Sequence, residues 1–528
     1  MRGRSERSEG RDGVERRIAR PAGSGSARAE AGRSRRVQDV RGLLAAAAGL
    51  LLLVPTAGGG ALPPGLSLEL RDRARLELWR FFEPAPPGGD PDYEFLANQL
   101  RFDVRYRRAI LSAHAAFQWV QLANLPRHAS GTPGGALGTG ALYFAHAGQR
   151  SPSALQIRAL ELGLRDPWEL GLSLDLGRFG YSSGGELDSG VPKIEAVKAT
   201  RIADRLVGEF GWSHFQRSFD GVKLRLERAP GQVGLAFLRP TEGGFEDGGN
   251  TRMDDIDLAI GTLTARPGAL VPGLELQAFY LLYDDERRVR ARPDNTGLPP
   301  PSRQDLRIHT VGGHAVGAWS VGPGELDGLF WGALQRGRWL EQDHRAYAGA
   351  LEVGYQLPEL PGRPWLRIGA FRSSGDSNPF DGTHETFFQV LPTARLYSLT
   401  AAYNLMNSTD AFVELRLFPL AGLTLRLDAH ALRLTEGRDR WYAGAGATRQ
   451  RGAIFGYGAR ATGGARELGR VVELSASWAP RPWVNLSGFY GRIFGREAVQ
   501  ASFARDDDLD FFYLELTLRW KAAGPPAP

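Results

Sequence analysis

The chain has 528 residues, contains no cysteine, and carries 65 basic against 59 acidic side chains. The lack of cysteine excludes both a disulfide framework and a thiolate metal site. The basic excess lies in residues 1–57, which hold twelve Arg against six acidic residues and leave 53 residues of each sign in the rest. Because the main body is neutral, its charge gives no case for nucleic acid binding.

Residues 1–61 are typical of a basic leader followed by an export signal. Residues 42–55 form a short apolar run, and small residues follow from Thr56 to Ala61. These are the parts of a secretory signal peptide. The apolar run is shorter than the roughly 20 residues that a membrane-spanning helix needs. The basic part exceeds what a signal requires, so we expect translation to start near Val37 or Val40 and the signal to be cleaved.

Beyond residue 65, apolar and polar residues alternate with a period of two. Leu100, Phe102 and Val104, for example, alternate with Arg101 and Asp103. This pattern predicts strands with one apolar and one polar face. A soluble sandwich or propeller would bury the apolar faces in a shared core, whereas a membrane barrel turns them to lipid and its polar faces to a wet lumen. The export signal, the many glycines and the alternation of short and long connections favour the barrel.

The alternating segments predict eighteen strands, an even number as expected for a bacterial single-chain barrel. They are residues 66–80, 97–107, 109–122, 153–165, 168–178, 219–228, 232–240, 254–265, 274–285, 303–318, 326–340, 344–357, 365–373, 411–418, 422–434, 466–479, 484–494 and 509–520. The fold prediction is therefore an all-β, antiparallel transmembrane barrel over residues 62–520, with a short tail at 521–528. The short connections, which contain Pro and Gly, are predicted periplasmic turns, and the long ones extracellular loops. Parity assigns the ambiguous residues 395–404 to a loop.

Three segments resemble landmarks of the alginate export family of outer-membrane porins. The first, Gly375 to Thr393, contains a Gly-Asp-x-Asn-Pro-x-Asp-Gly run and a later Phe-x-x-x-x-Pro-Thr. The second is Gly177-Arg178-Phe179, where Phe replaces the usual Gln and removes a polar contact, and the third is Arg217-Ser-Phe-Asp-Gly-Val222. The resemblance extends over about residues 66–520. It implies an eighteen-stranded export barrel with an Arg-rich, anion-selective lumen.

Inward parity gives a mixed set of charges on the polar faces of the strands. The first two strands are the most basic, because they bring six Arg against three acidic residues. Rings of Arg can hold carboxylates bidentately, and a low-dielectric wall focuses their field. Equally, such charges can pair across strands and only brace the wall. The predicted anion-binding residues are Arg71, Arg73, Arg75, Arg101, Arg105, Arg225, Arg367 and Arg426, with Arg178 and Arg217 near the outer loops; Arg307 and Asp305 are also predicted to face inward.

Acidic and histidine residues of the loops and the lumen suggest two other chemistries, metal binding and hydrolysis. Asp376, Asn378 and Asp381, or the run at 506–508, could bind Ca²⁺, but neither has the spacing of an EF-hand. Asp428 and His430 could serve a barrel-embedded hydrolase, yet no nucleophilic Ser accompanies them at a fixed spacing. The expectation is therefore no catalytic residue, no metal site and no required cofactor.

The sequence thus predicts an outer-membrane channel that passes an anionic, alginate-like polysaccharide or small anionic solutes. Its expected partners are outer-membrane lipid, the barrel assembly machinery, the solute and periplasmic export components, and not nucleic acid. A barrel-embedded hydrolase and a structural barrel with a plugged lumen are the alternatives.

Overall fold

A computed structural model describes residues 62–86, 88–131, 135–268, 271–393, 397–400, 402–503 and 507–526. The predicted leader and signal peptide, part of the segment 395–404 and Asp506 lie outside the described residues. The described part of 395–404 contains no strand, as parity required.

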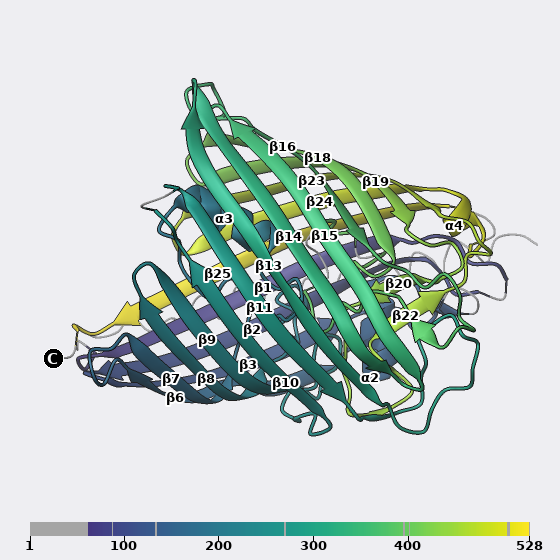
Figure 1. Ribbon diagram of the computed structural model, residues 1–528, viewed down its shortest axis with the longest axis horizontal. Helices are drawn as coiled ribbons and strands as arrows, with labels where there is room; N and C mark the ends of the chain where they lie inside the picture. The colour runs from purple at the N-terminus through teal and green to yellow at the C-terminus, as the bar shows by residue number, and fades with distance from the viewer. Residues whose placement is uncertain are drawn as a thin grey trace, which may run out of the picture. The chain divides into compact units, whose positions relative to one another are not determined.

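Eighteen long strands of the described chain form an antiparallel sheet, in which β25 closes back on β1 (Figure 1). The fold prediction is confirmed. The strands are β1 (Leu66–Arg80), β2 (Asp92–Arg108), β3 (Leu111–Ala123), β6 (Ser153–Arg165), β7 (Leu172–Phe179), β8 (Phe219–Arg228), β9 (Gly231–Pro240), β10 (Ile256–Ala265), β11 (Leu274–Asp285), β13 (Leu306–Val321), β14 (Gly324–Trp339), β15 (Gln342–Gln356), β16 (Trp365–Ser373), β18 (Ser408–Leu420), β19 (Leu423–Leu434), β23 (Glu467–Arg481), β24 (Val484–Gly495) and β25 (Asp508–Ala523).

Short elements lie in the long connections. The helices are α2 (Thr139–Ala147), α3 (Pro192–Arg201) and α4 (Glu497–Gln500). The short strands are β4 (Ser130–Gly131), β5 (Gly135–Ala136), β12 (Arg288–Val289), β17 (Thr383–His384), β20 (Trp441–Gly444), β21 (Arg451–Gly452) and β22 (Tyr457–Arg460). In the part of the chain that the structure describes, no helix has the length and apolar character needed to cross a membrane.

Several strand boundaries differ from the predicted ones, and three of the differences have a local cause. Strand β2 begins at Asp92, five residues early, because it pairs with β1 as far as Arg80. Strand β7 begins only at Leu172, since Asp166 and Glu169 adopt positive φ in the preceding turn. Strand β25 continues to Ala523 along β1, three residues past the predicted end.

The outer face of the wall is apolar, as a lipid-facing surface must be. Leu162, Leu351 and Leu160 expose more than 60% of their surface on this side. Large aromatic residues at periplasmic turns, such as Trp168 and Trp483, are also exposed, at the depth where interfacial Trp is enriched. Short turns on one side and long connections on the other place the long loops on the extracellular side.

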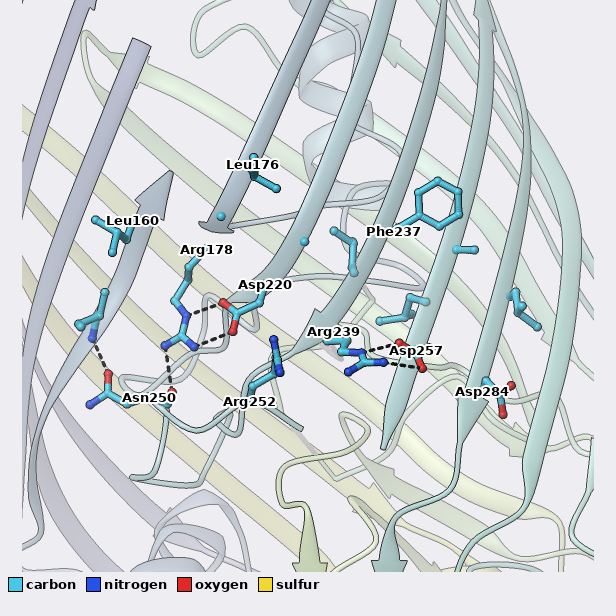
Figure 2. A pocket seen from close by; sticks show the side chains of 17 residues that line it. Leu160, Leu176, Arg178, Asp220, Phe237, Arg239, Asn250, Arg252, Asp257 and Asp284 are labelled. Atoms are coloured by element: carbon cyan, nitrogen blue, oxygen red, sulfur yellow. Dashed lines mark hydrogen bonds and ion pairs between the residues drawn. The ribbon is translucent and has the colours of Figure 1, made fainter. Parts of the chain in front are cut away.

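The strands β7 and β8 are short, with 8 and 10 residues, and the segment 180–218 that connects them turns into the barrel. Only residues 160–165 of β6 pair with β7, so the outer half of β6 has an open backbone edge. Asn250 (Figure 2) covers this edge. Its side chain accepts a hydrogen bond from the Ile157 N–H at 2.7 Å and donates one to the Leu155 carbonyl at 2.8 Å. The wall is therefore completed by a loop where strands are missing, because buried backbone groups need partners.

Candidate functional site

A row of three arginines crosses the inner face of the wall at β2, β1 and β25. The strand register places Arg71 directly opposite Arg101 on one side and Arg519 on the other. Arg101 Nε lies 2.9 Å from an Asp103 oxygen, and Arg519 Nε lies 3.2 Å from Glu69. Arg71 makes no ion pair with any described residue and reaches only Gln99, at 3.4 Å. This basic row carries more positive charge than its neighbours neutralise.

Asp103 is the shared counter-charge for the periplasmic side of this row. It lies 3.0 Å from Arg105 and 2.9 Å from His114, in addition to Arg101. The Arg105 side chain is 47% exposed. One carboxylate thus serves Arg101, Arg105 and His114, so positive charge exceeds negative charge on this part of the inner face.

Arg73 and Arg75, also predicted to bind anions, instead hold a loop inside the barrel. Arg73 donates to the carbonyls of Gly211 at 2.9 Å and Ser213 at 2.8 Å. The Arg75 guanidinium lies 3.6 Å from the centre of the Trp212 ring and 2.6 Å from Glu515. Both side chains are buried, so they bind segment 180–218 and do not line open space.

The opposite wall of the lumen is acidic, and helix α3 covers it. The acidic wall consists of Glu275 on β11, Asp327 on β14, Glu352 on β15, Glu414 on β18 and Asp428 on β19. From α3, Lys198 Nζ lies 3.0 Å from Glu275, and Arg201 Nη2 lies 2.5 Å from Glu414. Segment 180–218 therefore crosses the lumen, with α3 on the acidic wall and residues 211–213 on the basic side.

Arg201 is the centre of a buried ionic network. Its Nε also lies 3.6 Å from Glu352, and the Arg201, Glu352 and Glu414 side chains have no exposed surface. Burial lowers the pKa of Arg201, but Glu414, Glu352 and Asp428 outweigh it and raise that pKa above its ordinary value. The helix residue is therefore held as a cation.

Arg367 and Arg426, both predicted anion binders, belong to the same network. Arg367 lies 2.8 Å from Asp327 and 2.9 Å from Glu352, with no exposed side-chain surface. Arg426 lies 3.0 Å from Glu414 and 2.8 Å from Asp428. Their positive charge is compensated in place, so they brace the acidic wall.

The remaining predicted residues have separate surroundings. Arg217 is buried and donates to the Ala445 carbonyl at 2.6 Å, so it ties two loops together. Arg225 is exposed on the inner face of β8 and makes no ion pair with a described residue. Arg178 was expected among the luminal residues, but it lies on the outer face, where it binds Asp220 bidentately at 2.6 and 2.8 Å (Figure 2).

Arg307 and Asp305 also point outward, contrary to their predicted parity. Arg307 binds Asp284 on the outer face, and Asp305 lies 2.5 Å from Arg338. The inward positions of β13 are instead apolar, because Leu306 and Ile308 are fully buried. The lumen holds packed loop residues at this height, so the polar-inward rule reverses.

The family-like segment 375–393 supplies much of that packing. Leu391 N donates to the Leu206 carbonyl at 2.8 Å, and Gly208 N donates to the Leu391 carbonyl at 2.9 Å. Thr393 binds Asp204 through both its backbone N–H and its hydroxyl. These bonds join segment 374–407 to segment 180–218 inside the barrel.

The Gly-Asp part of the same segment docks on segment 435–466. A Cβ at Gly375 would lie 2.0 Å from the Asn407 side-chain oxygen, so only glycine fits. The Asp376 N–H donates to Asp439 at 3.0 Å, and Thr386 donates to the same carboxylate at 2.6 Å. Burial raises the pKa of Asp376 to about 7 and that of Asp439 to about 6. Segments 374–407 and 435–466 together form what we call the extracellular cap. It therefore contains two carboxyl groups whose pKa values lie near neutral pH.

The residues considered for metal binding and for hydrolysis have other partners in the structure. Within the described ranges, no three His, Asp or Glu side chains form a group able to hold a metal ion. Asp381 caps its own turn by accepting the Thr383 N–H at 2.8 Å. His430 Nδ1 lies 2.9 Å from Asp410, so Asp410, and not the predicted Asp428, is its ion-pair partner among the described residues.

The basic residues of α3 are the functional residues that the sequence reading missed. Three basic residues, Lys193, Lys198 and Arg201, follow Pro192 at helical spacing within a long connection. Proline at the start of a helix and basic residues in its last turn are recognised helix signals. This pattern was the available clue.

Comparisons with known proteins agree with this architecture. Residues 200–502 match the sequence profile of the alginate export family. Among solved structures, the chain is similar to OpdK of Pseudomonas aeruginosa, with a TM-score of 0.53, 9% identity, and coverage of 88% of this chain and 100% of that chain. It is also similar to OccAB2 of Acinetobacter baumannii, with a TM-score of 0.54, 8% identity, and coverage of 88% and 100%. A comparison with curated proteins gives no match.

Proposed function

Because this chain belongs to the alginate export family, we propose that it is an outer-membrane channel. Its solute would be an anionic polysaccharide, alginate-like in chemistry, or small anionic solutes. The luminal basic row at Arg101, Arg71 and Arg519 carries this proposal. Carboxylates bind Arg bidentately, and confinement between low-dielectric walls strengthens the attraction.

The position of the row suits entry from the periplasm. Arg105, Arg107 and Arg225 are exposed further toward the periplasmic turns. An anionic chain would thus meet exposed cations first and the denser row next. Segment 180–218, held by Arg73 on one wall and Arg201 on the other, lies on its path, so transport requires that segment to move.

The proposed partners follow from this location. Outer-membrane lipid surrounds the apolar wall, the barrel assembly machinery inserts it, and periplasmic export components deliver the polymer. The cleaved signal peptide remains a prediction, because residues 1–61 lie outside the described part of the chain.

Reversal potentials in planar bilayers, measured across a salt gradient, test the proposal. The wild-type channel should prefer anions, and the triple variant R71Q/R101Q/R105Q should move the reversal potential toward cation preference. Luminal substitutions tune selectivity more than stability, so the variant should still assemble. The difference should shrink as salt approaches about 1 M, where the Debye length is only ~3 Å.

A matched control removes equally many positive charges that the wall already compensates. The variant R178Q/R239Q/R307Q removes three arginines that each bind a carboxylate on the outer face. Its reversal potential should stay near that of the wild type. Unchanged selectivity in R71Q/R101Q/R105Q at low salt would show that these residues brace the wall. Zero conductance of the wild type under all conditions would favour a structural, plugged barrel.

A further inference from the structure

A second set of arginines lies on the outer face of the barrel, near the extracellular ends of the strands. The strand register places Arg336 of β14 directly opposite Arg345 of β15. Arg372 of β16 is opposite Thr409, which in turn is opposite Arg433 of β19. Their parity matches that of the lipid-facing residues Leu334 and Leu351, so these side chains point out of the barrel.

These outward arginines are not neutralised by the protein. Arg336, Arg345 and Arg372 are exposed, and none makes an ion pair with a described residue. Like charges directly opposite each other on neighbouring strands are destabilising. An anion bound between Arg336 and Arg345 would relieve this repulsion.

A groove of about 620 Å³ lies where the three arginines meet. Its lining also contains Arg466, whose guanidinium donates to the Thr435 carbonyl, and two acidic residues, Glu385 and Glu436. Four basic residues thus face two acidic ones. We call this the basic rim groove.

Apolar side chains continue the groove toward the membrane centre along the same strands. Leu334 and Tyr347, which line it, expose 61% and 45% of their surface. One step further, Leu351 and Ile368 expose 68% and 51%. A ligand of this surface meets cations at the rim and an uninterrupted apolar wall below.

The other side of the barrel offers an internal comparison. The groove of about 950 Å³ over β6–β10 also joins rim charges to lipid-facing residues such as Leu176 and Phe237 (Figure 2). There, however, each arginine has a carboxylate: Arg178 binds Asp220, and Arg239 lies 2.6 Å from Asp257. Both grooves have apolar surroundings, but of the two, only the basic rim groove has arginines without a carboxylate partner among the described residues.

We propose that the basic rim groove binds the phosphate-bearing headgroup of an acylated lipid in the outer leaflet. Guanidinium groups bind phosphate bidentately. The apolar strip below accounts for the acyl chains, which a free phosphate or a soluble polysaccharide lacks. The bound phosphate would relieve the repulsion between the opposed arginines.

Binding of purified bisphosphorylated, hexa-acylated lipid A to the full chain in detergent micelles tests this assignment. Native mass spectrometry would count the retained lipids and yield an apparent Kd. The variant R336Q/R345Q/R372Q should bind about a hundredfold more weakly, since each Arg near an anionic membrane surface contributes roughly fivefold. The matched control R178Q/R239Q/R307Q loses the same charge from the same belt and should bind like the wild type.

Further measurements identify the source of the phosphate and check that each variant folds. Heat-dependent gel mobility reports barrel assembly, and R336K/R345K/R372K should restore most of the binding because it keeps the charge. Dephosphorylated lipid A should bind the wild-type protein as weakly as lipid A binds the glutamine variant. Equal binding by R336Q/R345Q/R372Q and the wild type would overturn the site. Full competition by inorganic phosphate or by an alginate oligosaccharide would overturn the lipid assignment.

Discussion

The two walls of the lumen use charge in opposite ways. On the acidic wall, every carboxylate of the central network has a cation, supplied by neighbouring strands or by α3 through Lys198 and Arg201. On the basic wall, Arg73 and Arg75 are occupied by segment 180–218, while Arg71 has no ionic partner among the described residues. The inserted segment is cationic where it meets acid and offers carbonyls where it meets arginine.

This difference indicates where solute recognition and loop anchoring take place. A buried ion pair resists rearrangement because separating it leaves an uncompensated charge. Carbonyl bonds to an arginine leave its charge intact, so the same side chain can serve a passing anion once the loop moves. The acidic wall therefore anchors the inserted segment, and the basic wall is the face that a solute can compete for.

The largest effect is expected from removing the strand that closes the basic wall. Deleting residues 512–523 removes most of β25, and β1 loses the partner that carries Arg519 and Glu515. An open edge in hydrocarbon leaves backbone groups without partners, so the barrel should fail to assemble. Heat-dependent gel mobility of outer-membrane fractions would measure this.

The matched deletion of residues 524–528 should assemble. Among the described residues, it loses two backbone bonds at the end of the β1–β25 seam, from Gly524 N to the Leu66 carbonyl and from Gly65 N to the Pro525 carbonyl. Equal assembly of both truncations would contradict closure through β25.

Removing the central cation of the acidic wall should have the next largest effect. The variant R201Q takes one cation from Glu414 and Glu352, which keep Arg426 and Arg367 as partners. Breaking a buried pair completely costs about 3–5 kcal/mol, so the loss should approach the lower end of that range. Denaturant unfolding followed by tryptophan fluorescence should show the loss, and single-channel records should show a more open pore.

Lys193 provides the comparison on the same helix. Its partner Glu325 is 45% exposed, so K193Q should cost about 1 kcal/mol or less. A loss in K193Q as large as that in R201Q would mean that the helix is held by general packing and not by the network.

The alternation of residues predicted the strands well because lipid-facing leucines repeat with a period of two. It failed at Arg307 and Asp305, where the interior is packed by loops and the buried residues are Leu306 and Ile308. There the apolar side faces inward, and charge faces the rim. A polar-inward rule assumes a wet lumen, which the sequence of a strand cannot establish.

Arg178 and α3 show two further limits. The period of two places Arg178 on the opposite face of β7 from the luminal Asp175, in agreement with its outward position. The insertion of α3, by contrast, depends on carboxylates from five distant strands. No local pattern contains that information, and the ion pairs become apparent only when the barrel closes.

Two arginines of the basic wall should separate loop anchoring from anion attraction. The variant R73Q removes the bonds to Gly211 and Ser213, and bonds from a charged donor contribute about 1.5–3 kcal/mol. Conductance should rise and fluctuate while anion preference persists. The variant R71Q should lower anion preference at constant conductance, and identical phenotypes would contradict the division of roles.

The smallest effect is expected in the extracellular cap, above both walls, where acidic groups have no cation of the kind that α3 supplies below. Burial raises the pKa of Asp376 to about 7, from an ordinary value of 3.8. A carboxyl with a raised pKa stabilises the folded cap fully below its ordinary pKa and loses that contribution as the pH rises through about 7. Hydrogen exchange in segments 374–386 and 435–442 should therefore be slower, after correction for intrinsic rates, at about pH 5 than at about pH 8. The variant D376N should reduce this difference, leaving the part due to Asp439, whereas D381N, on an exposed turn of the same loop, should preserve it. A pH difference of wild-type size in D376N would assign the effect to Asp439, the other buried carboxyl of this region whose pKa is raised.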